Sequence, residues 1–309
     1  CDGTVCAVAP RCDDGVQNGT ETGLDCGGGC LACDGEACAA DGDCQHGWCT
    51  AGGFCDTPTC DDGIQNGAEE GVDCGGGCVS CAPALASVDY PVIAVGGRLV
   101  VTGNRFTGTS AVSIGGRPQA FVVDSATQLT VSTVDDATPI GAQQLVVTNG
   151  AGPSDGLALT VIRLQISEID ADTAGAPDAL EFVEISTGVP GVDLTGYSLV
   201  LWNGNGDVTY ITKGLTQADS AGLLLVGNSG VVPTPAITFP NDQLQQGQDA
   251  VALYQAPASA FPNSTALSSV TARLLDAVVY DTNDADDAEL LNALISSDPA
   301  DPKRVQVNE

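Results

Sequence analysis

The sequence predicts a mainly β protein. Disulfide-rich, irregular N-terminal repeats over residues 1–82 precede two β-sandwiches over residues 83–162 and 163–309. Three observations support this fold class. All 14 cysteines lie within the first 81 residues. Beyond Pro83, short alternating apolar segments separated by glycine turns recur about every 8–12 residues, which is typical of an antiparallel sandwich. Apolar residues make up 43% of the chain, too many for a disordered protein.

The charge of the chain excludes two classes of partner. Forty acidic residues against nine basic ones give a formal net charge of −31. A polyanion of this size repels nucleic acids and anionic lipid surfaces, whereas it attracts divalent cations. We therefore expect no nucleic-acid partner.

The cysteines indicate an oxidising compartment, because an even number crowded into one short region is typical of exported proteins. The chain has no methionine, so we expect that an upstream segment, most simply a secretory signal, precedes it. No apolar run approaches the roughly 18–20 residues that span a bilayer. These observations predict an extracellular or cell-surface protein without a transmembrane segment.

The head, residues 1–82, is built on a repeat. Residues 12–33 read CDDGVQNGTETGLDCGGGCLAC, and residues 60–81 read CDDGIQNGAEEGVDCGGGCVSC. The two agree at 16 of 22 positions at an offset of 48 residues. Cys1, Cys6 and Cys12 match the spacing of Cys49, Cys55 and Cys60, so the chain is expected to open inside a repeat and to be part of a longer protein. A lipid anchor on Cys1 is the alternative.

Disulfides are expected to replace a hydrophobic core in the head, because its apolar side chains are few. We expect pairing within each 48-residue unit. The disulfide cysteines are Cys1, Cys6, Cys12, Cys26, Cys30, Cys33, Cys38, Cys44, Cys49, Cys55, Cys60, Cys74, Cys78 and Cys81. The two CxxC pairs, Cys30–Cys33 and Cys78–Cys81, leave zinc binding and redox chemistry as alternatives.

Oxygen-bearing side chains recur at matched positions of the two copies. They are Asp13, Asp14, Asn18, Glu21 and Asp25 in the first, and Asp61, Asp62, Asn66, Glu69 and Asp73 in the second. Calcium binds six to eight oxygens of carboxylates, amides and carbonyls, and glycines permit the necessary turns. The spacing is not that of an EF-hand. Residues 1–81 carry fifteen acids and one base, a net charge of −14, which a cation would relieve. We predict calcium as the cofactor; solvated acidic turns are the alternative.

The head resembles cysteine-rich repeats found in tandem in large secreted and surface proteins of gliding and predatory bacteria. The residues that carry the resemblance are CDDGxQNGxExGxDCGGxC followed by CxxxxxDCxxGxCxxxxxC. It covers the whole head. The resemblance implies stalk or spacer units without catalysis.

The first sandwich is predicted from alternating segments broken by glycine turns. The candidate strands are Arg98–Thr102, Ala111–Ile114, Ala120–Val123, Gln128–Thr133 and Gln144–Thr148. The segment over residues 83–162 resembles an IPT/TIG immunoglobulin-like domain, through VDYP at 88–91, VTGNRF at 101–106, IGG at 114–116 and VTNGAGPS at 147–154. That resemblance implies a spacer or binding module.

The second sandwich follows from Arg163. Its candidate strands are Arg163–Ile169, Phe182–Ser186, Ser198–Trp202, Leu223–Val226, Ala250–Tyr254 and Arg273–Tyr280, with a helix over Ala288–Ile295. Residues 163–309 resemble a lamin tail domain, also immunoglobulin-like, through LQISEID at 164–170, EFVEI at 181–185, VDLTGYSLVLWNG at 192–204 and LLDAVVYDTNDAD at 274–286. The family has a further edge strand after this segment, so we expect the domain to be incomplete at Glu309.

Other polar residues of the chain give weaker signals. His46 is the one histidine, which excludes histidine-based triads, and we interpret it as a surface loop residue. A group of acids near the first strand of the second sandwich suggests a cation site more than a glycosidase pair: Asp170, Asp172, Asp178 and Glu181. The run Asp281–Asp287 is interpreted as a solvated loop and helix cap, with calcium as the second reading.

These patterns predict an exported, non-enzymatic structural or adhesive protein, stabilised by calcium and used as a subunit of a fibre or surface stalk. Its partners would be a protein or glycan surface, or copies of itself in a homopolymer. The alternative is the non-catalytic accessory region of a larger secreted hydrolase. A catalytic domain beside this segment in the full reading frame would favour that alternative.

Overall fold

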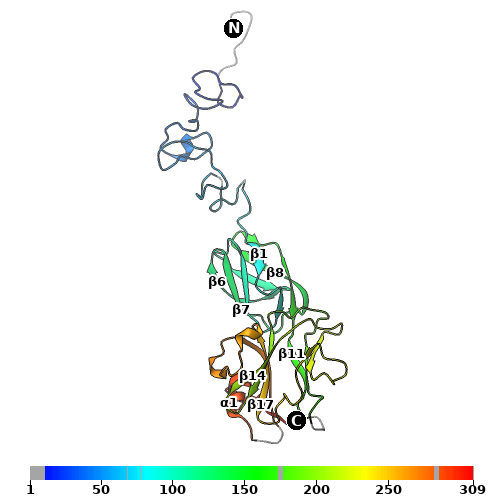
Figure 1. The fold of residues 1–309 in the computed structure, drawn as a ribbon. Coiled ribbons are helices and arrows are strands. Elements are labelled where there is room, and N and C mark those ends of the chain that lie inside the picture. Colours follow the sequence, from blue (N-terminus) through cyan, green and yellow to red (C-terminus); the bar gives the residue numbers. More distant parts are fainter. Residues whose placement is uncertain (1–10, 68, 77, 173–176, 282–284, 309) are drawn as a thin grey trace, which may run out of the picture. The chain divides into compact units, whose positions relative to one another are not determined.

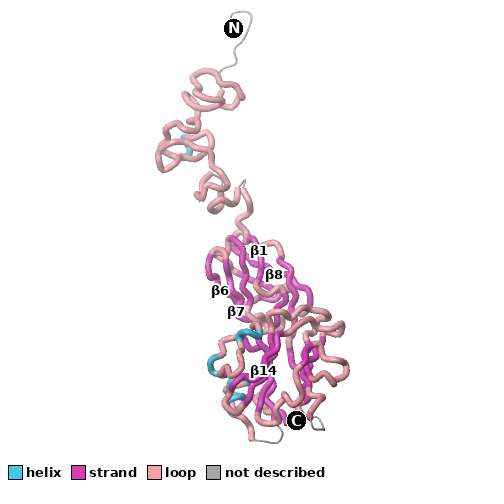
Figure 2. Tube along the Cα trace, viewed as in Figure 1, coloured by secondary structure: helices cyan, strands magenta, loops and turns pink. Residues whose placement is uncertain are grey.

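The computed structural model describes residues 11–67, 69–76, 78–172, 177–281 and 285–308. The chain divides into two compact units, Cys1–Cys81 and Ala82–Glu309. The fold class is confirmed: the structure is mainly β, with sandwich-like sheets after a head that is almost entirely loop and turn (Figures 1 and 2). In the described part of the chain, no helix is long and apolar enough to cross a membrane.

The head has one short helix in its described residues, the 3-10 helix η1 (Asp41–Asp43), and a few isolated β-bridges. Its larger apolar side chains are turned outward. Val16, Leu24, Ile64 and Val72 are each at least half exposed. What is buried instead is sulfur: the side chains of Cys26, Cys44, Cys55 and Cys74 are at most 5% exposed. Covalent bonds therefore take the place of an apolar core in this unit.

Six disulfides hold the described part of the head, and each joins two cysteines of one 48-residue repeat. The pairs are Cys12–Cys30, Cys26–Cys33, Cys38–Cys49, Cys44–Cys55, Cys60–Cys78 and Cys74–Cys81. Cys1 and Cys6 lie outside the described residues. The pairing of the first motif, with sequence separations of 18 and 7, recurs in the second motif. Equal sequence motifs thus fold into equal cross-linked loops.

The first sandwich consists of two sheets. One has the order β1-β3-β7-β6, and the other has the order β2-β10-β8-β4-β5, with β9 paired to β8. The strands are β1 (Ala84–Val88), β2 (Val92–Ala94), β3 (Leu99–Asn104), β4 (Ala111–Ile114), β5 (Arg117–Pro118), β6 (Ala120–Ser125), β7 (Gln128–Thr133), β8 (Gly141–Asn149), β9 (Gly152–Pro153) and β10 (Leu157–Ile162). Alternate residues of β3, such as Leu99 and Val101, are fully buried against the opposite sheet, as a period of two requires.

The second sandwich also has two sheets, with the orders β11-β12-β15-β16 and β14-β13-β17-β18-β19. The strands are β11 (Gln165–Asp170), β12 (Phe182–Ser186), β13 (Ser198–Asn203), β14 (Val208–Gly214), β15 (Leu223–Gly227), β16 (Ile237–Thr238), β17 (Asp249–Gln255), β18 (Arg273–Asp281) and β19 (Val307–Asn308). Short helices follow the strands: the 3-10 helices η2 (Ala258–Ala260) and η3 (Leu267–Ser269), the α-helix α1 (Ala288–Leu290) and the π-helix η4 (Leu291–Ile295).

Strand β17 is buried along its whole length because the second sandwich has apolar cores on both faces of its larger sheet. On one face, Val251 and Leu253 join the core between the two sheets. On the other face, Ala252 and Tyr254 pack with Trp202 and Leu290 under a cover that includes α1 and η4. The predicted helix over 288–295 therefore exists, as α1 continued by η4, and it closes this outer core.

Three pairings differ from the antiparallel arrangement that the sequence predicted. Strands β2 and β10, β15 and β16, and β18 and β19 pair in parallel. Parallel partners cannot be joined by a tight turn: the chain runs round the first sandwich from β2 to β10, and residues 228–236 connect β15 to β16. The sequence pattern alone did not reveal β2, β10 or β14; β14 has mostly half-buried residues, which weakens its alternation.

The first sandwich has its own hydrophobic core, and two of its residues join the core of the second sandwich. Ala94 and Ile162, from the edge of the first sandwich, are fully buried among the core residues of the second, together with Leu164 of the connection. The hydroxyl of Tyr197 accepts a hydrogen bond from the backbone N–H of Ala94 (3.0 Å) and donates one to the carbonyl of Val92 (2.9 Å). Apolar and polar contacts thus join residues that are about a hundred positions apart.

Tyr197→Phe tests this connection. The change leaves a buried N–H and a buried carbonyl without their partner, so the free energy of unfolding of the chain should fall by about 1–3 kcal/mol. Urea denaturation followed by tryptophan fluorescence measures it. Tyr90→Phe is the matched control, because the Tyr90 hydroxyl reaches the carbonyl of Gly196 at only 3.5 Å and its side chain is partly exposed. Equal stability of the two variants would contradict the assignment.

Candidate cation-binding loops and interdomain pocket

In the first acidic loop, Asp25 closes the turn that Asp14 and Gly15 form. Its backbone adopts a φ of +52°, in the left-handed region. Its Oδ1 accepts hydrogen bonds from the N–H groups of Asp14 (2.9 Å) and Gly15 (3.0 Å), and its Oδ2 accepts a second bond from Gly15 (2.9 Å). Both carboxylate oxygens therefore bind backbone, which fixes the shape of the loop before any ion is considered.

The second acidic loop repeats this geometry. Asp73 has a φ of +54°, and both of its carboxylate oxygens accept the N–H of Gly63, at 3.0 and 3.1 Å. Asp62 accepts the N–H of Ile64 (2.9 Å), as Asp14 accepts that of Val16 (3.0 Å). The hydrogen bond from Asn66 lowers the pKa of the Asp62 carboxyl. The position-for-position match of the sequences thus extends to the hydrogen bonds.

The asparagine at the centre of each loop has a carbonyl oxygen without a donor. The Nδ2 group of Asn18 donates to Asp14 (2.9 Å), and that of Asn66 donates to Asp62 (2.8 Å). A carboxylate can only accept, so these bonds fix which end of each amide is nitrogen. The Oδ1 atoms of Asn18 and Asn66 are buried and have no hydrogen-bond partner among the described residues, and Asn66 is 7% exposed. An orphaned amide oxygen in an acidic loop is a ligand atom for a hard cation.

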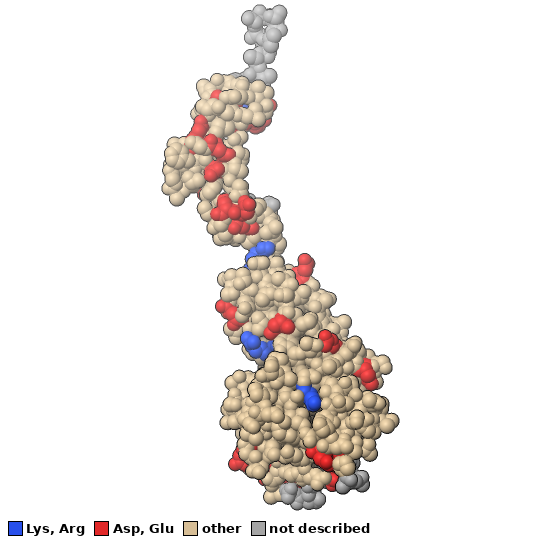
Figure 3. Space-filling model, viewed as in Figure 1, with Lys and Arg blue, Asp and Glu red and all other residues tan. Residues whose placement is uncertain are grey.

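The remaining predicted ligands lie in two settings. Glu21 and Glu69 accept the N–H groups of Asn18 (2.8 Å) and Asn66 (3.1 Å). Asp13 and Asp61 are exposed, and Asp13 lies 3.3 Å from the guanidinium of Arg11. The structure thus brings four of the five predicted residues of each loop into one network and leaves the first aspartate at the surface. Figure 3 shows acidic side chains gathered on the head, where basic ones are scarce.

The cysteines of the CxxC pairs do not bond to each other. Cys30 bonds to Cys12 and Cys33 bonds to Cys26, so each member of the CxxC pair is tied to a different part of its loop. Among the described residues, the groups of three metal-binding side chains that converge within 4.8 Å all contain such disulfide sulfurs, as with Cys12, Glu21 and Cys30. Oxidised sulfur lacks the thiolate that zinc binding and redox exchange require.

His46 is an exposed loop residue that lies beside Asp34, with its Nδ1 at 2.9 Å from Oδ1 of the carboxylate. Hydrogen bonds from His46 and Thr57 lower the pKa of Asp34. The side chains bridge two segments of the head, which is a structural role.

Acids near the first strand of the second sandwich form hydrogen bonds with backbone groups. Glu181 is fully buried, and its two carboxylate oxygens accept the N–H groups of Gln243 (2.9 Å) and Leu244 (3.0 Å). Burial raises its pKa. Asp178 exchanges hydrogen bonds with Asp242 through backbone groups and one carboxylate. Burial, followed by the charge of Asp178, raises the pKa of Asp170. These contacts hold the loop at residues 240–244.

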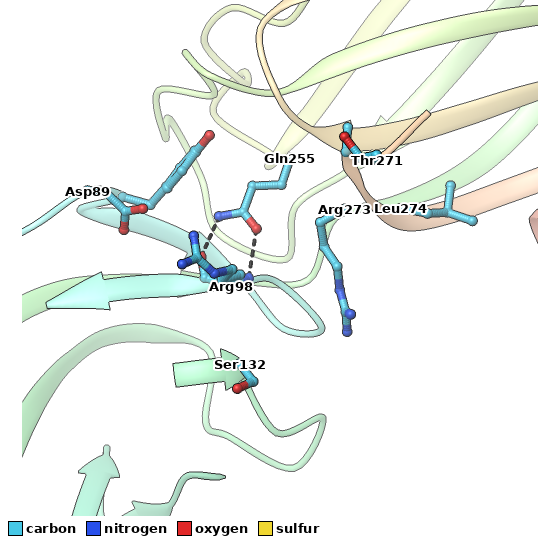
Figure 4. Close-up of a pocket in the computed structure, with 9 residues that line it drawn as sticks. Asp89, Arg98, Ser132, Gln255, Thr271, Arg273 and Leu274 are labelled. Atoms are coloured by element: carbon cyan, nitrogen blue, oxygen red, sulfur yellow. Dashed lines mark hydrogen bonds between the residues drawn. The ribbon is translucent and has the colours of Figure 1, made fainter. Parts of the chain in front are cut away.

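A pocket opens where the two sandwiches meet (Figure 4). The first sandwich contributes Asp89, Tyr90, Arg98 and Ser132, and the second contributes Gln255, Thr271, Ala272, Arg273 and Leu274. The two guanidinium groups are unusual in a chain with nine basic residues. They line the pocket together with Tyr90, the carboxylate-bearing Asp89 and the hydroxyl-bearing Ser132 and Thr271. The sequence reading did not find this site, because its residues converge only through the packing of the two domains.

Hydrogen bonds join the two sides of this pocket. The side chain of Gln255 accepts the N–H of Arg98 and donates to its carbonyl, both at 2.7 Å, as Figure 4 shows. The guanidinium of Arg273 donates to the carbonyl of Gly96 (2.7 Å) and to the hydroxyl of Thr133 (3.0 Å). A Cβ at Gly97 would lie 2.8 Å from the carbonyl of Ala94 and 3.1 Å from the Gln255 side chain, so glycine permits this close approach.

A second polar region lies at the turn between β13 and β14, where acids are buried. Asp249 is 2% exposed; its Oδ1 accepts the N–H of Gly204 (3.0 Å), and its Oδ2 is buried without a partner. Burial, with a further contribution from the charge of Asp287, raises its pKa to about 6. Asp207 has a buried Oδ1 without a partner, and burial followed by the charge of Asp287 raises its pKa.

No family model matches the chain, and no curated protein matches its sequence. Among solved structures, it is similar to the surface glycan-binding protein SGBP-B of Bacteroides ovatus, with 15% identity over 62% of this chain and 44% of that one, at a TM-score of 0.24. A second SGBP-B, from Bacteroides uniformis, has 15% identity over 60% and 71%, at a TM-score of 0.25. The plexin A4 extracellular region has 12% identity over 67% and 20%, at a TM-score of 0.31.

The chain spans 44% of the length of the Bacteroides ovatus protein, and 38% of the length of a further matched structure, a complex with a xylogluco-oligosaccharide. At TM-scores below 0.5 these likenesses carry no functional argument, so the function is inferred from the sites themselves.

The raised pKa of Asp249 predicts a pH dependence in solutions without divalent cations. The folded state holds the proton up to about pH 6, whereas the unfolded chain releases it near 3.8. This contribution to stability is therefore complete below pH 3.8 and is lost as the pH rises through 6. Asp249→Asn should lack it and should be more stable than the natural chain at pH 7. The urea midpoints of the natural chain and of Asp249→Asn from pH 4 to pH 7 measure this pH-dependent stability. The exposed Asp286→Asn is the control. If the midpoints of Asp249→Asn and of the natural chain change in parallel with pH, the prediction is contradicted.

Proposed function

We propose that this chain is part of an exported, non-catalytic structural and adhesive protein at the cell surface or outside the cell. In this proposal the head is a run of the cysteine-rich repeats that its sequence resembles. The two sandwiches would be an IPT/TIG-like domain and a lamin-tail-like domain. The observation that carries the proposal is the junction of the two sandwiches, which apolar packing and hydrogen bonds hold together. The two sandwiches thus form one body, with a pocket where they meet.

Both units suit a mechanical role, each for its own reason. The head has six disulfides in its described residues, and cross-links of this density limit unfolding and proteolysis. In the body, the burial of Ala94 and Ile162 in the core of the second sandwich and the bonds of Gln255 resist bending between the sandwiches. Assembly of copies into a filament stays a prediction.

The partner that fits the interdomain pocket is a glycan surface. Sugars present hydroxyls and, in acidic glycans, carboxylates, which guanidinium and hydroxyl donors bind. Arg98 is suited to this role because its backbone bonds to Gln255, while the one hydrogen bond that its guanidinium makes to a described residue is a long one, 3.4 Å to Thr130. The side chain can therefore contact a ligand without loosening the junction.

Arg98→Ala tests glycan binding without removing the hydrogen bonds between the backbone of residue 98 and Gln255. Affinity electrophoresis through gels that contain soluble neutral or uronate-bearing polysaccharides should show that the natural chain is retarded by at least one of them. The variant should bind that polysaccharide about tenfold more weakly, as expected for the loss of a charged hydrogen bond. Arg117→Ala is the matched control, because Arg117 pairs with Asp135 away from the pocket. No retardation of the natural chain, or equal retardation of all three proteins, would contradict the glycan proposal.

We also propose that each acidic loop of the head binds calcium. The residues that would hold it are Asn18, Asp14 and Glu21 in the first loop, and Asn66, Asp62 and Glu69 in the second. The support is the orphaned amide oxygen at the same position of both copies, together with the charge of −14 over residues 1–81. Calcium would supply the missing partner of that oxygen and offset the repulsion among carboxylates. Asp25 and Asp73 would shape the loops, and Asp13 and Asp61 would add charge.

The calcium proposal is tested by thermal melting of the intact, non-reduced chain with calcium and with EDTA. We expect calcium to raise the melting temperature of the head, and Asn18→Ala with Asn66→Ala to remove most of that shift. The matched control replaces the neighbouring exposed residues, Gln17→Ala with Gln65→Ala, and should keep the shift. Equal melting in calcium and EDTA, together with no calcium by elemental analysis, would exclude the proposal.

A further inference from the structure

The turn between β13 and β14 carries buried negative charge without a counter-ion. The turn has the sequence Asn203-Gly204-Asn205-Gly206-Asp207, which ends on an acid. Two further acids, Asp249 and Asp287, lie beside Gly204. Asp249 and Asp287 are 2% and 8% exposed. The ion pairs among the described residues involve other acids, so no lysine or arginine neutralises these three there. Charged groups at such depth are expensive unless something compensates them.

The backbone at Gly204 is built to let two carboxylates approach. Its N–H donates to Oδ1 of Asp249 at 3.0 Å. A Cβ on Gly204 would lie 2.6 Å from Oδ2 of Asp287, and 2.0 Å from the carbonyl of Gln248, so only glycine fits between them. Asp287 is itself held in place, since its Oδ1 caps the N–H of Leu290 at 2.9 Å and its N–H donates to Gln306. One oxygen of each carboxylate is thus held by a backbone N–H, and Oδ2 of Asp249 has no hydrogen-bond partner among the described residues, which leaves it for a ligand.

The surface above Asp249 is a depression lined by oxygen-bearing groups. It is formed by Asn203, Gly204, Asn205, Gln245, Gly247, Gln248 and Asp249. Asp249 is the one charged residue in this lining, and its unpartnered Oδ2 is the independent sign that a ligand is missing. Amides and backbone carbonyls around one or two carboxylates are the donor set of a calcium-like cation.

We propose that the second sandwich binds a divalent cation of the calcium type at Gly204, with Asp249 and Asp287 as its carboxylate ligands. Asp207 is not a third ligand, because no trio of these acids lies among the groups that converge within 4.8 Å. Its charge instead raises the negative potential at the site. The cation ties three segments that are distant in sequence: the β13–β14 turn, the start of β17 and the start of α1. This site is separate from the acidic loops of the head and does not depend on the glycan proposal.

Luminescence of Tb³⁺, which replaces calcium at oxygen sites, separates this site from the head. All five tyrosines of the chain lie in the body; burial raises the pKa of Tyr210 and of Tyr280, and the negative charge of Asp249 adds to both shifts. Titration of the full chain with Tb³⁺ alone, excited through tyrosine, should give sensitised emission that calcium displaces. We expect a loss of at least about tenfold in Asp249→Asn and in Asp287→Asn, which keeps a side chain able to cap the helix.

Two controls make the result specific. Asp286→Asn removes the same charge from an exposed neighbour of Asp287 and should keep the emission. The head variant Asn18→Ala with Asn66→Ala should also keep it, so a failure of the head proposal leaves this one standing. Absence of emission from the natural chain would overturn the site, as would undiminished emission from folded Asp249→Asn. Equal loss in Asp286→Asn would overturn it too, because it would indicate diffuse attraction to negative charge.

Melting temperatures give a second readout that a purely structural role would not reproduce. If the pocket holds only water and a protonated Asp249, then Asp249→Asn melts no lower than the natural chain in either calcium or EDTA. If it holds the cation, Asp249→Asn melts lower than the natural chain in calcium but not in EDTA. The first pattern overturns the proposal and the second supports it.

Discussion

The apolar contact that joins the first sandwich to the core of the second is the interaction on which the rest of the body depends. Ala94 and Ile162 belong to strands of the first sandwich, but they are buried among residues of the second. The hydroxyl of Tyr197 forms hydrogen bonds with the backbone of Ala94 and of Val92. This contact sets the position of Arg98 opposite Gln255, and it thereby creates the interdomain pocket. A pocket built from two domains keeps its shape only while their junction stays closed. The binding role we propose for the body is therefore a consequence of its packing.

The head is stabilised differently from the body, because it has too few apolar side chains to form a core. Its larger valines and leucines are exposed, and the most buried side chains include Cys26, Cys44, Cys55 and Cys74, each in a disulfide. A chain held by local disulfides can carry dense negative charge that would unfold a small domain without cross-links. Its carboxylates bind backbone N–H groups first, as Asp25 and Asp73 do. In this account a cation completes loops that covalent bonds and these hydrogen bonds have already shaped.

The sequence predicted those features that depend on local patterns. Most predicted strands exist within a few residues, and the predicted helix at 288–295 is present. The residues of each acidic loop were found because a repeat displays them twice. What depends on distant contacts could not be predicted: the parallel pairing of β2 with β10, the meeting of Arg98 with Gln255, and the approach of Asp287 to Gly204. Gly204 does stand in a turn-like NGNG run, yet nothing in that run shows which carboxylate lies against it.

Calorimetry of the intact chain under non-reducing conditions tests the central claim most directly. If the contact at Ala94, Ile162 and Tyr197 couples the core of the first sandwich to that of the second, residues 82–309 unfold in a single transition whose calorimetric and van't Hoff enthalpies agree. Two separate transitions for the sandwiches, at different temperatures and with the enthalpy divided between them, would contradict this account. They would show that the junction at Ala94, Ile162 and Tyr197 is a contact between independent domains.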